Sequence, residues 1–340
     1  MSMPPTHTLL ATIILPHLVD APTPLTFMRG YGSKTYPVTA LTWGLLAISI
    51  IVVIIITGLV VAGAWRRRAR SSDGIAQVPV NRGASGVGSV AIAVGISSLV
   101  LLGSVIWTVV VLADINAPAR KPALTIEVTG QQWWWKARYL GNDPSRVLTT
   151  ANEIHIPTGQ PIRIKLLSAD VLHSFWVPAL TGKTETVPGQ TNVTWLEADR
   201  PGVYAGQCTL YCGRQHSHMG FLVVAQKPAA FKAWLNAEIK PAAAPPPSDT
   251  TALRGEKDFV FHCGTCHTVR GTDAGGTVAP DLTHVMSRAM LAANTLRNTP
   301  ANLAGWIANP QAQKPGTKMP TLYLSGPQLN AIVTYVRTLK

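Results

Sequence analysis

Two long apolar segments dominate the first third of the chain. Residues 38–65 and 87–113 contain no charged side chain, and each is longer than the roughly 20 residues that a helix needs to cross the hydrocarbon of a bilayer. A pair of buried core helices is the alternative, but at this length such helices would be expected to show a polar face. The pattern therefore predicts two transmembrane helices.

The residues around these segments indicate how they are oriented. Residues 66–70 contain four arginines, and short cytoplasmic loops are enriched in Lys and Arg. We therefore expect a cytoplasmic loop over residues 66–86, with both ends of the chain on the opposite side of the membrane. Residues 1–37 would form an exterior N-terminal segment. A cleaved signal at residues 8–21 is an alternative, although the first seven residues carry no Lys or Arg.

After the apolar segments the chain changes to short runs that are typical of β-strands. Some alternate apolar and polar residues, and others are rich in β-branched and aromatic residues between Gly and Pro. Four of these runs lie at residues 124–128, 162–166, 192–196 and 220–224. Many short strands within residues 118–240, closed by a short helix at 228–239, predict a cupredoxin-like β-sandwich.

A run rich in proline and alanine, residues 241–250, follows the predicted sandwich. Such a run is extended where it adopts a polyproline conformation. We expect it to keep residues 251–340 near the sandwich at an effective concentration of roughly millimolar, without fixing one pose. The fold prediction is a multidomain membrane protein with two transmembrane helices, a β-sandwich and a C-terminal domain.

The four cysteines form two clusters, and the second cluster has a specific pattern. Cys263 and Cys266 are separated by two residues and followed directly by His267, which is the attachment signature of a covalent c-type haem. His267 would then be the proximal iron ligand. A redox pair or a zinc site is the alternative, but zinc would need two further ligands at comparable spacing.

A c-type haem of this kind needs a sixth iron ligand from downstream. Met319 lies in a segment rich in Gly and Pro, and a thioether ligand raises the reduction potential, as suits an electron carrier. Met286 and Met290 are alternatives. They stand four residues apart in a stretch that we expect to be helical, and there they would face the core of the small domain.

The first cysteine cluster has the composition of a copper site. Cys208, Cys212, His216 and Met219 are spaced by four, four and three residues, and soft thiolate, imidazole and thioether ligands select copper. A blue-copper atom uses two histidines, and His173 is our candidate for the second one. A disulfide between the two cysteines is the alternative, and it is compatible with an oxidising compartment.

These motifs together are similar to those of a known family. Residues 170–190, 206–219 and the aromatic run 131–135 resemble subunit II of the haem–copper oxidases, and residues 251–340 resemble a class I, all-α cytochrome c domain. The resemblance implies a dinuclear copper centre called CuA beside haem c. Carried over to this chain, its ligands are His173, Cys208, Cys212, His216, Met219 and the backbone carbonyl of Leu210.

The resemblance also implies a function. The chain would be subunit II of a cytochrome c oxidase, taking electrons at haem c and passing them through CuA to subunit I, which reduces oxygen to water. It would lie in the bacterial inner (cell) membrane, with its metal domains on the periplasmic or extracellular side. Expected partners are subunit I, other oxidase subunits and a donor, either cytochrome c or a cytochrome bc complex. The oxygen site would lie in another subunit, so no catalytic residue is expected in this chain.

Trp133 has two interpretations. In the resembling family the matching tryptophan is where electrons enter. Alternatively, the three consecutive tryptophans 133–135 would anchor the domain at the lipid interface, where amphipathic rings accumulate.

Two departures from the family affect the predictions. Leu210 stands where the family usually has a Glu that binds a Mg²⁺ shared with subunit I, which makes that Mg²⁺ site doubtful. Residues 74–113 contain no acidic residue, so proton uptake through this subunit is not expected. Both departures are compatible with a second possible function, in which the chain is the subunit of a CuA-containing nitric-oxide reductase. A third possible function is that of a membrane-bound copper-delivery or thiol-redox module.

The charge of the chain adds little to these alternatives. It has 29 Lys and Arg against 16 Asp and Glu, and a basic protein can bind nucleic acid. No nucleic-acid-binding module that combines basic and aromatic residues is present in the sequence, however, and part of the excess lies in the predicted cytoplasmic loop. Nucleic acid is therefore not an expected partner.

Overall fold

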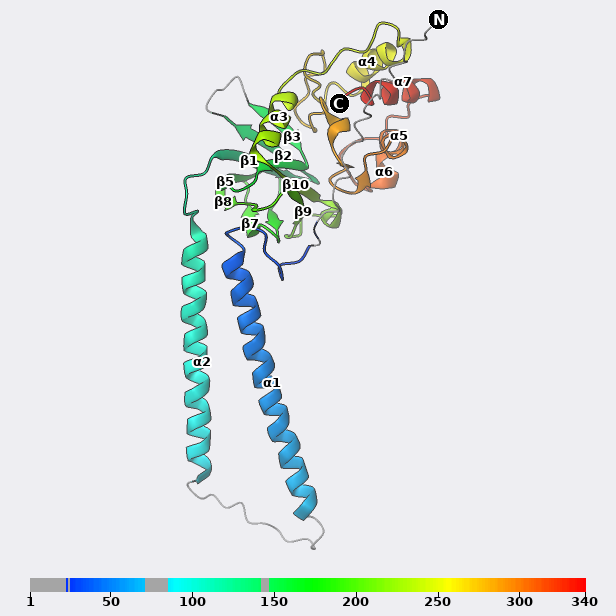
Figure 1. The fold of residues 1–340 in the computed structure, drawn as a ribbon. Helices are drawn as coiled ribbons and strands as arrows, with labels where there is room; N and C mark the ends of the chain where they lie inside the picture. Colours follow the sequence, from blue (N-terminus) through cyan, green and yellow to red (C-terminus); the bar gives the residue numbers. More distant parts are fainter. Residues whose placement is uncertain (1–22, 24, 71–84, 142–146) are drawn as a thin grey trace, which may run out of the picture.

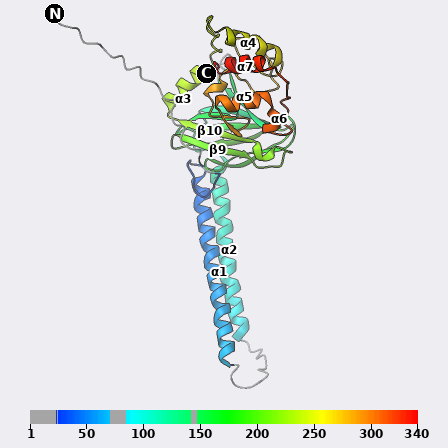
Figure 2. The same cartoon turned by 90° about the vertical axis from the view of Figure 1, so that its right-hand side faces the viewer.

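The computed structural model describes residues 23, 25–70, 85–141 and 147–340. Figure 1 shows two long helices, a β-sandwich above them and a small helical domain beside the sandwich. The stretch 8–21, considered as a signal, and most of the predicted loop 66–86 lie outside the described residues. The two views in Figures 1 and 2 agree that the small domain lies at the end of the sandwich away from the helices.

Helix α1 (Tyr36–Arg70) and helix α2 (Ser85–Asn116) contain the two predicted spans. Within them, Tyr36–Arg66 and Val87–Asn116 are long and apolar enough to cross a membrane. Their apolar side chains are exposed along most of both helices, which fits a lipid environment and not water. Gly44 of α1 allows the indole of Trp107 in α2 to pack against it, because a Cβ there would lie 2.3 Å from the ring.

The sandwich consists of two five-stranded sheets. The first has the order β3 (Leu148–Ala151), β2 (Trp134–Leu140), β1 (Leu124–Gln131), β5 (Ile162–Ser168) and β8 (Asn192–Leu196). The second has the order β4 (Glu153–Pro157), β10 (Gly220–Gln226), β9 (Gly202–Cys208), β6 (His173–Val177) and β7 (Thr181–Thr186). The four predicted strands are confirmed as β1, β5, β8 and β10.

The core lies between the two sheets. Alternate residues of β1, among them Ile126 and Val128, are fully buried, as the period of two in a strand requires. The rings of Trp135, Phe175 and Phe221 pack edge-on or stacked at the centre. Helix α3 (Pro228–Glu238) follows β10 and packs against this core through Phe231, where the closing helix was predicted.

The C-terminal domain is mainly helical. Its elements are α4 (Thr250–His262), η3 (Val285–Ser287), β11 (Met290–Leu291), β12 (Leu296–Arg297), α5 (Pro300–Ala308), α6 (Pro310–Gln313) and α7 (Gly326–Val336). Gly255 allows α4 to cross α7 closely, because a Cβ there would lie 1.9 Å from the carbonyl oxygen of Ala331. Met286 packs against the domain core as expected. The predicted helix through Met290 is wrong, since that residue begins the β11–β12 hairpin.

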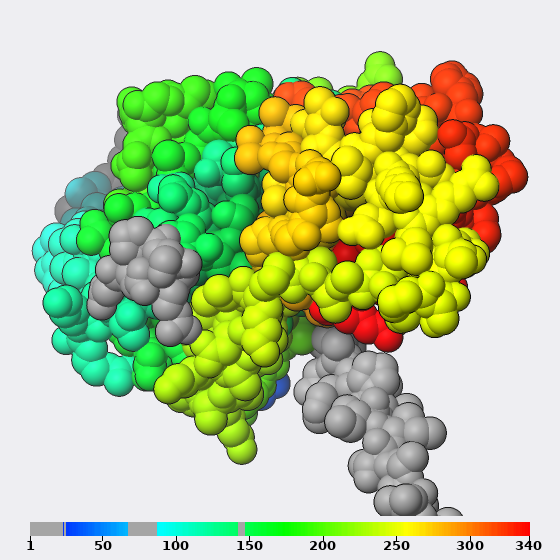
Figure 3. Space-filling model, turned by 90° about the horizontal axis from the view of Figure 1, so that it is seen from above, coloured from blue at the N-terminus to red at the C-terminus, as the bar shows by residue number. Residues whose placement is uncertain are grey.

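The two domains form one packed arrangement, which Figure 3 shows as the green sandwich in contact with the yellow-to-red domain. The segment between them is held by the C-terminal domain. The backbone N–H of Ala242 donates to the carbonyl of Arg270 at 2.8 Å, and the carbonyl of Lys240 accepts from the His284 ring at 2.9 Å. The expectation that the linker would leave the pose open is therefore wrong, because hydrogen bonds that sequence spacing does not reveal fix its start.

Candidate metal centres

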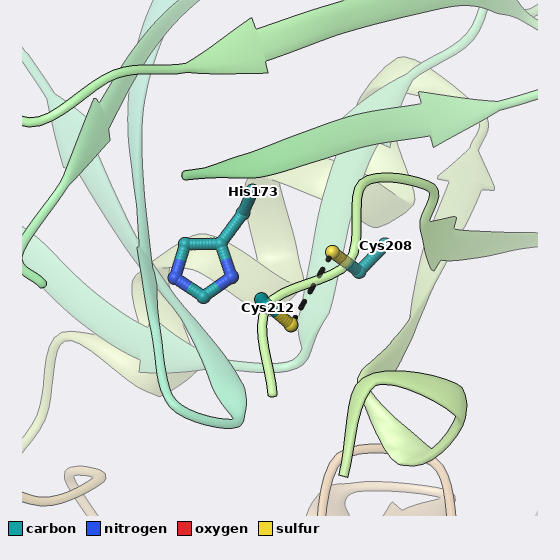
Figure 4. A group of neighbouring side chains, drawn as sticks. All are labelled: His173, Cys208 and Cys212. Carbon is teal, nitrogen blue, oxygen red and sulfur yellow. Dashed lines mark hydrogen bonds between the residues drawn. The ribbon is translucent and has the colours of Figure 1, made fainter. Parts of the chain in front are cut away.

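The loop between β9 and β10 and the start of β6 bring the predicted copper ligands together. Cys208 ends β9, Cys212 lies in the loop, and His173 begins the neighbouring strand β6. One donor atom from each lies within 4.8 Å of the others, and all three residues are buried. Figure 4 shows the His173 ring beside the two sulfur atoms. The site is therefore built from the loop of the β9–β10 hairpin and the start of the neighbouring strand β6.

The remaining predicted ligands surround the same point. The Sγ of Cys212 lies 3.6 Å from Nδ1 of His216 and 3.8 Å from Sδ of Met219. The Sγ of Cys208 lies 3.3 Å from the carbonyl oxygen of Leu210. His216 lies in the short helix η2 (His216–His218), whose turn directs it back toward the cysteines. All six predicted donors are therefore neighbours, although their roles as ligands remain predictions.

The two thiols are not joined to each other. Their sulfur atoms are 3.8 Å apart and both cysteines are free, whereas a disulfide bond is about 2.0 Å long. The disulfide alternative is therefore not what the structure shows. The neighbouring Cys212 thiol lowers the pKa of the Cys208 thiol to about 4 against the effect of burial. The Cys208 thiolate and burial together raise the pKa of Cys212 well above its usual value.

His173 is oriented as a metal ligand would be. Its Nε2 lies 2.8 Å from Oδ1 of Asp170, so the ring N–H donates there. Its Nδ1 is buried and has no hydrogen-bond partner among the described residues. A carboxylate that fixes the tautomer while the other ring nitrogen stays free is the usual arrangement behind a metal-binding imidazole. The orphaned nitrogen beside two thiols fits copper.

Asp170 is held in place by several further groups. Its Oδ2 accepts a hydrogen bond from the backbone N–H of Gln132 at 2.8 Å and from Nζ of Lys318 at 3.1 Å. Burial opposes the charged form, but the hydrogen bonds from Gln132 and His173 outweigh it and lower the pKa of Asp170. The carboxylate therefore stays ionised and keeps its acceptor role toward His173.

The predicted haem segment begins where α4 ends. Nδ1 of His267 lies 2.7 Å from the carbonyl oxygen of Pro280, so Nδ1–H donates and Nε2 keeps its lone pair. Burial lowers the pKa of His267, which keeps the ring neutral and able to bind iron. The loop after the motif is held by the N–H of Ala279, which donates to the Cys266 carbonyl at 3.0 Å. These residues fit a covalently attached haem.

Met319 lies beyond α6, in a segment that is hydrogen-bonded to the rest of the domain. Its carbonyl oxygen accepts from Nε2 of Gln311 at 2.8 Å, and its side chain is half-buried. Its role as the sixth iron ligand remains a prediction.

The tryptophan run does not anchor the domain in lipid. Trp133 is 9% exposed and Trp135 is fully buried. The indole N–H of Trp133 donates to the carbonyl of Cys212 at 3.1 Å, and that of Trp135 donates to the carbonyl of Met219 at 3.3 Å. The lipid-interface interpretation is wrong because these rings fill the space behind the copper site.

The sequence reasoning missed several residues that shape the site. Trp135, the amide of Gln132 and Lys314 all contact the copper loop or its neighbours. The sequence gives little sign of these roles. Gln132 and Trp135 lie within two residues of Trp133, whereas Lys314 belongs to no motif.

The fold and the two sites define a class: a membrane-anchored cupredoxin-like domain joined to a c-type cytochrome. Residues 124–226 match the family described as cytochrome c oxidase subunit II, periplasmic domain. Residues 252–340 match the cytochrome c family. The cytochrome c oxidase subunit 2 of Bacillus sp. (strain PS3) is 32% identical over 257 residues, which cover 71% of this chain and 70% of that protein. The chain belongs to the cytochrome c oxidase subunit II family and carries a C-terminal cytochrome c domain.

Two further proteins are similar to parts of this chain. The cytochrome c oxidase subunit 2 of Alkalihalophilus pseudofirmus (strain ATCC BAA-2126 / JCM 17055 / OF4) is 39% identical over 220 residues, or 63% of this chain. That match spans only 61% of the relative's own length. The crystal structure of the periplasmic domain of subunit II of cytochrome oxidase from Bradyrhizobium japonicum is 29% identical, with a TM-score of 0.33. It covers 36% of this chain and 96% of its own.

Proposed function

We propose that this chain is the subunit through which electrons enter a terminal respiratory oxidase of the bacterial inner membrane. The cytochrome c domain receives the electrons, and the copper domain delivers them to subunit I, where oxygen is reduced to water. One observation carries the proposal: the predicted copper donors converge on a single point that lies directly against the docked C-terminal domain.

The side chains of the two sites would hold the metal groups as follows. Cys263 and Cys266 bind the porphyrin covalently, and His267 and Met319 bind its iron. The two coppers are held by His173, Cys208, Cys212, His216, Met219 and the carbonyl of Leu210. When bound, haem c and CuA each accept and release one electron at a time.

The protein's contribution is a donor set that is already assembled. His173, Cys208, Cys212 and Met219 are buried, and hydrogen bonds hold the His173 ring and the carbonyls of Cys212 and Met219, so the donor set needs little rearrangement when charge changes. Trp133 connects the two domains: its N–H donates to Cys212, and its carbonyl accepts from Lys314 of the C-terminal domain at 2.8 Å. We propose Trp133 as the point where electrons enter the copper domain.

The partners follow from this role. Subunit I and other oxidase subunits surround the membrane helices, and a cytochrome c or a cytochrome bc complex supplies the C-terminal domain. The chain itself carries out no oxygen chemistry. With Leu210 in place of an acidic side chain, we expect no Mg²⁺ ligand from this position.

The test uses the purified oxidase complex that contains this chain. We expect an electron paramagnetic resonance signal from one unpaired electron shared by two copper nuclei, and oxygen uptake supported by the reduced donor. A complex with the dicopper signal that consumes nitric oxide but not oxygen would contradict the oxidase role. A copper-delivery or thiol-redox module would show no shared-electron signal.

A further inference from the structure

The part of the interdomain contact nearest the predicted copper ligands is made by residues 314–319, which we name the bridging loop. A second part joins Glu153 and Glu238 of the copper domain to the N–H of Ala289 and the hydroxyl of Ser287. The bridging loop leads directly to Met319, the proposed iron ligand. Three of its residues make hydrogen bonds to the copper domain: Lys314, Pro315 and Lys318. Gly316 adopts a left-handed φ of 87° and lies against the Arg214 side chain, where a Cβ would approach within 3.0 Å. A glycine at this turn allows the close approach.

Lys314 is the most enclosed of these residues. Its side chain crosses from the cytochrome domain into the copper domain and is 2% exposed. Its Nζ donates to the carbonyls of Trp133 at 2.8 Å and His218 at 2.7 Å in the copper domain, and to that of Ala292 at 3.1 Å in its own domain. An ammonium has three N–H donors, and all three are used here. Burial lowers the pKa of Lys314 to about 7.

Each of these contacts of the bridging loop reaches the immediate surroundings of a predicted copper ligand. Gln215, which precedes His216, donates from Nε2 to the Pro315 carbonyl at 2.6 Å. Lys318 donates to Asp170, which in turn holds His173. Trp133 links Lys314 to the Cys212 carbonyl. The bridging loop therefore contacts both the segment around His173 and the loop that carries Cys212 and His216.

A turn of the β11–β12 hairpin adds to the contact near the copper site. Ala292, Ala293 and Asn294 all have left-handed φ values, of 52°, 58° and 66°, which are uncommon for non-glycine residues. This turn directs the Ala292 carbonyl to Lys314 and the Ala293 carbonyl to the N–H of Gly220, at 3.2 Å. Gly220 follows the predicted ligand Met219. The backbone is thus shaped to meet the copper loop.

We propose that Lys314 is a positioning residue that locks the cytochrome domain in one pose over the copper site, so that electrons pass within the chain. The inference rests on the proposed electron-transfer function. Removing the ammonium leaves the carbonyls of Trp133 and His218 in the docked interface without this donor, whereas in the separated domains water satisfies them. The Ala292 carbonyl keeps its hydrogen bond from the Thr295 hydroxyl. The docked state alone is therefore penalised.

The test compares Lys314→Met with Lys257→Met in the full-length chain carrying haem and copper. Methionine keeps the apolar stem but donates no hydrogen bond, and Lys257 is an exposed lysine on α4. After rapid photochemical reduction of the haem, we expect electron transfer to copper to slow about tenfold in Lys314→Met, because the docked pose then loses both hydrogen bonds that Lys314 makes to the copper domain. The control should keep the original rate. The haem absorbance and the copper resonance should be unchanged in both.

A second measurement reports the pose itself. The amide of Gly220, bonded across the interface, should exchange its hydrogen faster in Lys314→Met than in the unaltered chain. Lys318→Ala, whose side chain is 62% exposed, cannot harm the core and should slow transfer by a few-fold. An unaltered rate and unaltered Gly220 exchange in Lys314→Met would overturn the proposal. If Lys314→Met does not assemble, two other results would together overturn the proposal. They are an unaltered electron-transfer rate in Lys318→Ala and a Gly220 amide that exchanges without protection in the unaltered chain.

Failure of the proposed function gives a different result. In that case the unaltered chain itself would show no transfer from haem to copper, whatever stands at position 314. A transfer rate in the unaltered chain that is lost in the Lys314 variant, with both metal spectra intact, supports both proposals together.

Discussion

The copper site and the haem site take their residues from the chain in opposite ways. The haem motif, Cys263 to His267, is contiguous, and its proximal ligand is oriented by a carbonyl only 13 residues away. The copper site joins His173 of one strand to a loop that begins 35 positions later (208 − 173). A contiguous motif reveals its chemistry in the local sequence, whereas a dispersed site depends on the sheet order that brings β6 beside β9.

This difference predicts that the two sites fail independently. His267→Ala should have the largest effect, the complete loss of haem-dependent absorbance, because the iron loses its proximal ligand. The copper resonance should remain, since no predicted copper donor lies in that segment. Visible absorption and metal analysis of the purified chain check this. His262→Ala, five residues earlier at the end of α4, is the matched control and should keep the haem.

The complementary change is made in the copper loop. Cys212→Ser should abolish the signal of two coupled coppers, because Cys212 lies beside Cys208, His216 and Met219 at once. Haem absorbance should stay at its original level. Ser217→Ala, an exposed position on the same loop, should change neither signal. Loss of both signals in Cys212→Ser would contradict the independence of the two sites.

Local patterns predicted much of the fold. The alternation at residues 124–128 and 162–166 indicated strands that pair in parallel as β1 and β5, because a half-buried strand must alternate. Ligand chemistry and spacing predicted four of the copper donors and made His173 a candidate, although no spacing rule links it to Cys208. The carbonyl of Leu210 and the dinuclear centre needed the family resemblance.

The contact between the domains could not be predicted in this way. Lys314 bonds to Trp133 across 181 positions, and an isolated lysine gives no periodic signal. The Pro/Ala run suggested that the C-terminal domain moves freely, because composition describes only the linker itself. The groups that restrain the domain lie elsewhere in the sequence, so the run gives no sign of them.

A smaller effect is expected behind His173, a predicted copper ligand. Asp170→Asn should weaken copper binding about 10- to 100-fold, because the amide is neutral and fixes the ring tautomer less well. Copper titration of the metal-free chain measures this affinity. Lys318→Met removes the other charged partner of Asp170 without touching His173, and it should leave the affinity nearly unchanged. Equal losses in both variants would show that the salt bridge matters, and not the orientation of the ring.

The smallest effect concerns protons at the copper site. With a pKa of about 4, Cys208 is already a thiolate at neutral pH, whereas the raised pKa of Cys212 keeps that thiol protonated. Copper must displace the Cys212 proton, so binding should strengthen as pH rises, about tenfold per unit between about pH 8 and 9. The Cys208 thiolate and Asp170 raise the pKa of His173 although burial opposes this, so lower pH should add a further loss of affinity.

Proton release on binding gives the direct measurement. In weakly buffered solution at about pH 8.5, copper added to the metal-free, reduced chain should release about one proton per site. Release of two protons would mean that the Cys208 thiol or the His173 imidazole, whose pKa is raised, is also protonated before binding, which contradicts a single displaced proton. The predicted haem site offers the contrast within the same molecule: covalent attachment would consume its thiols, so only the dispersed copper site should couple metal binding to pH in this range.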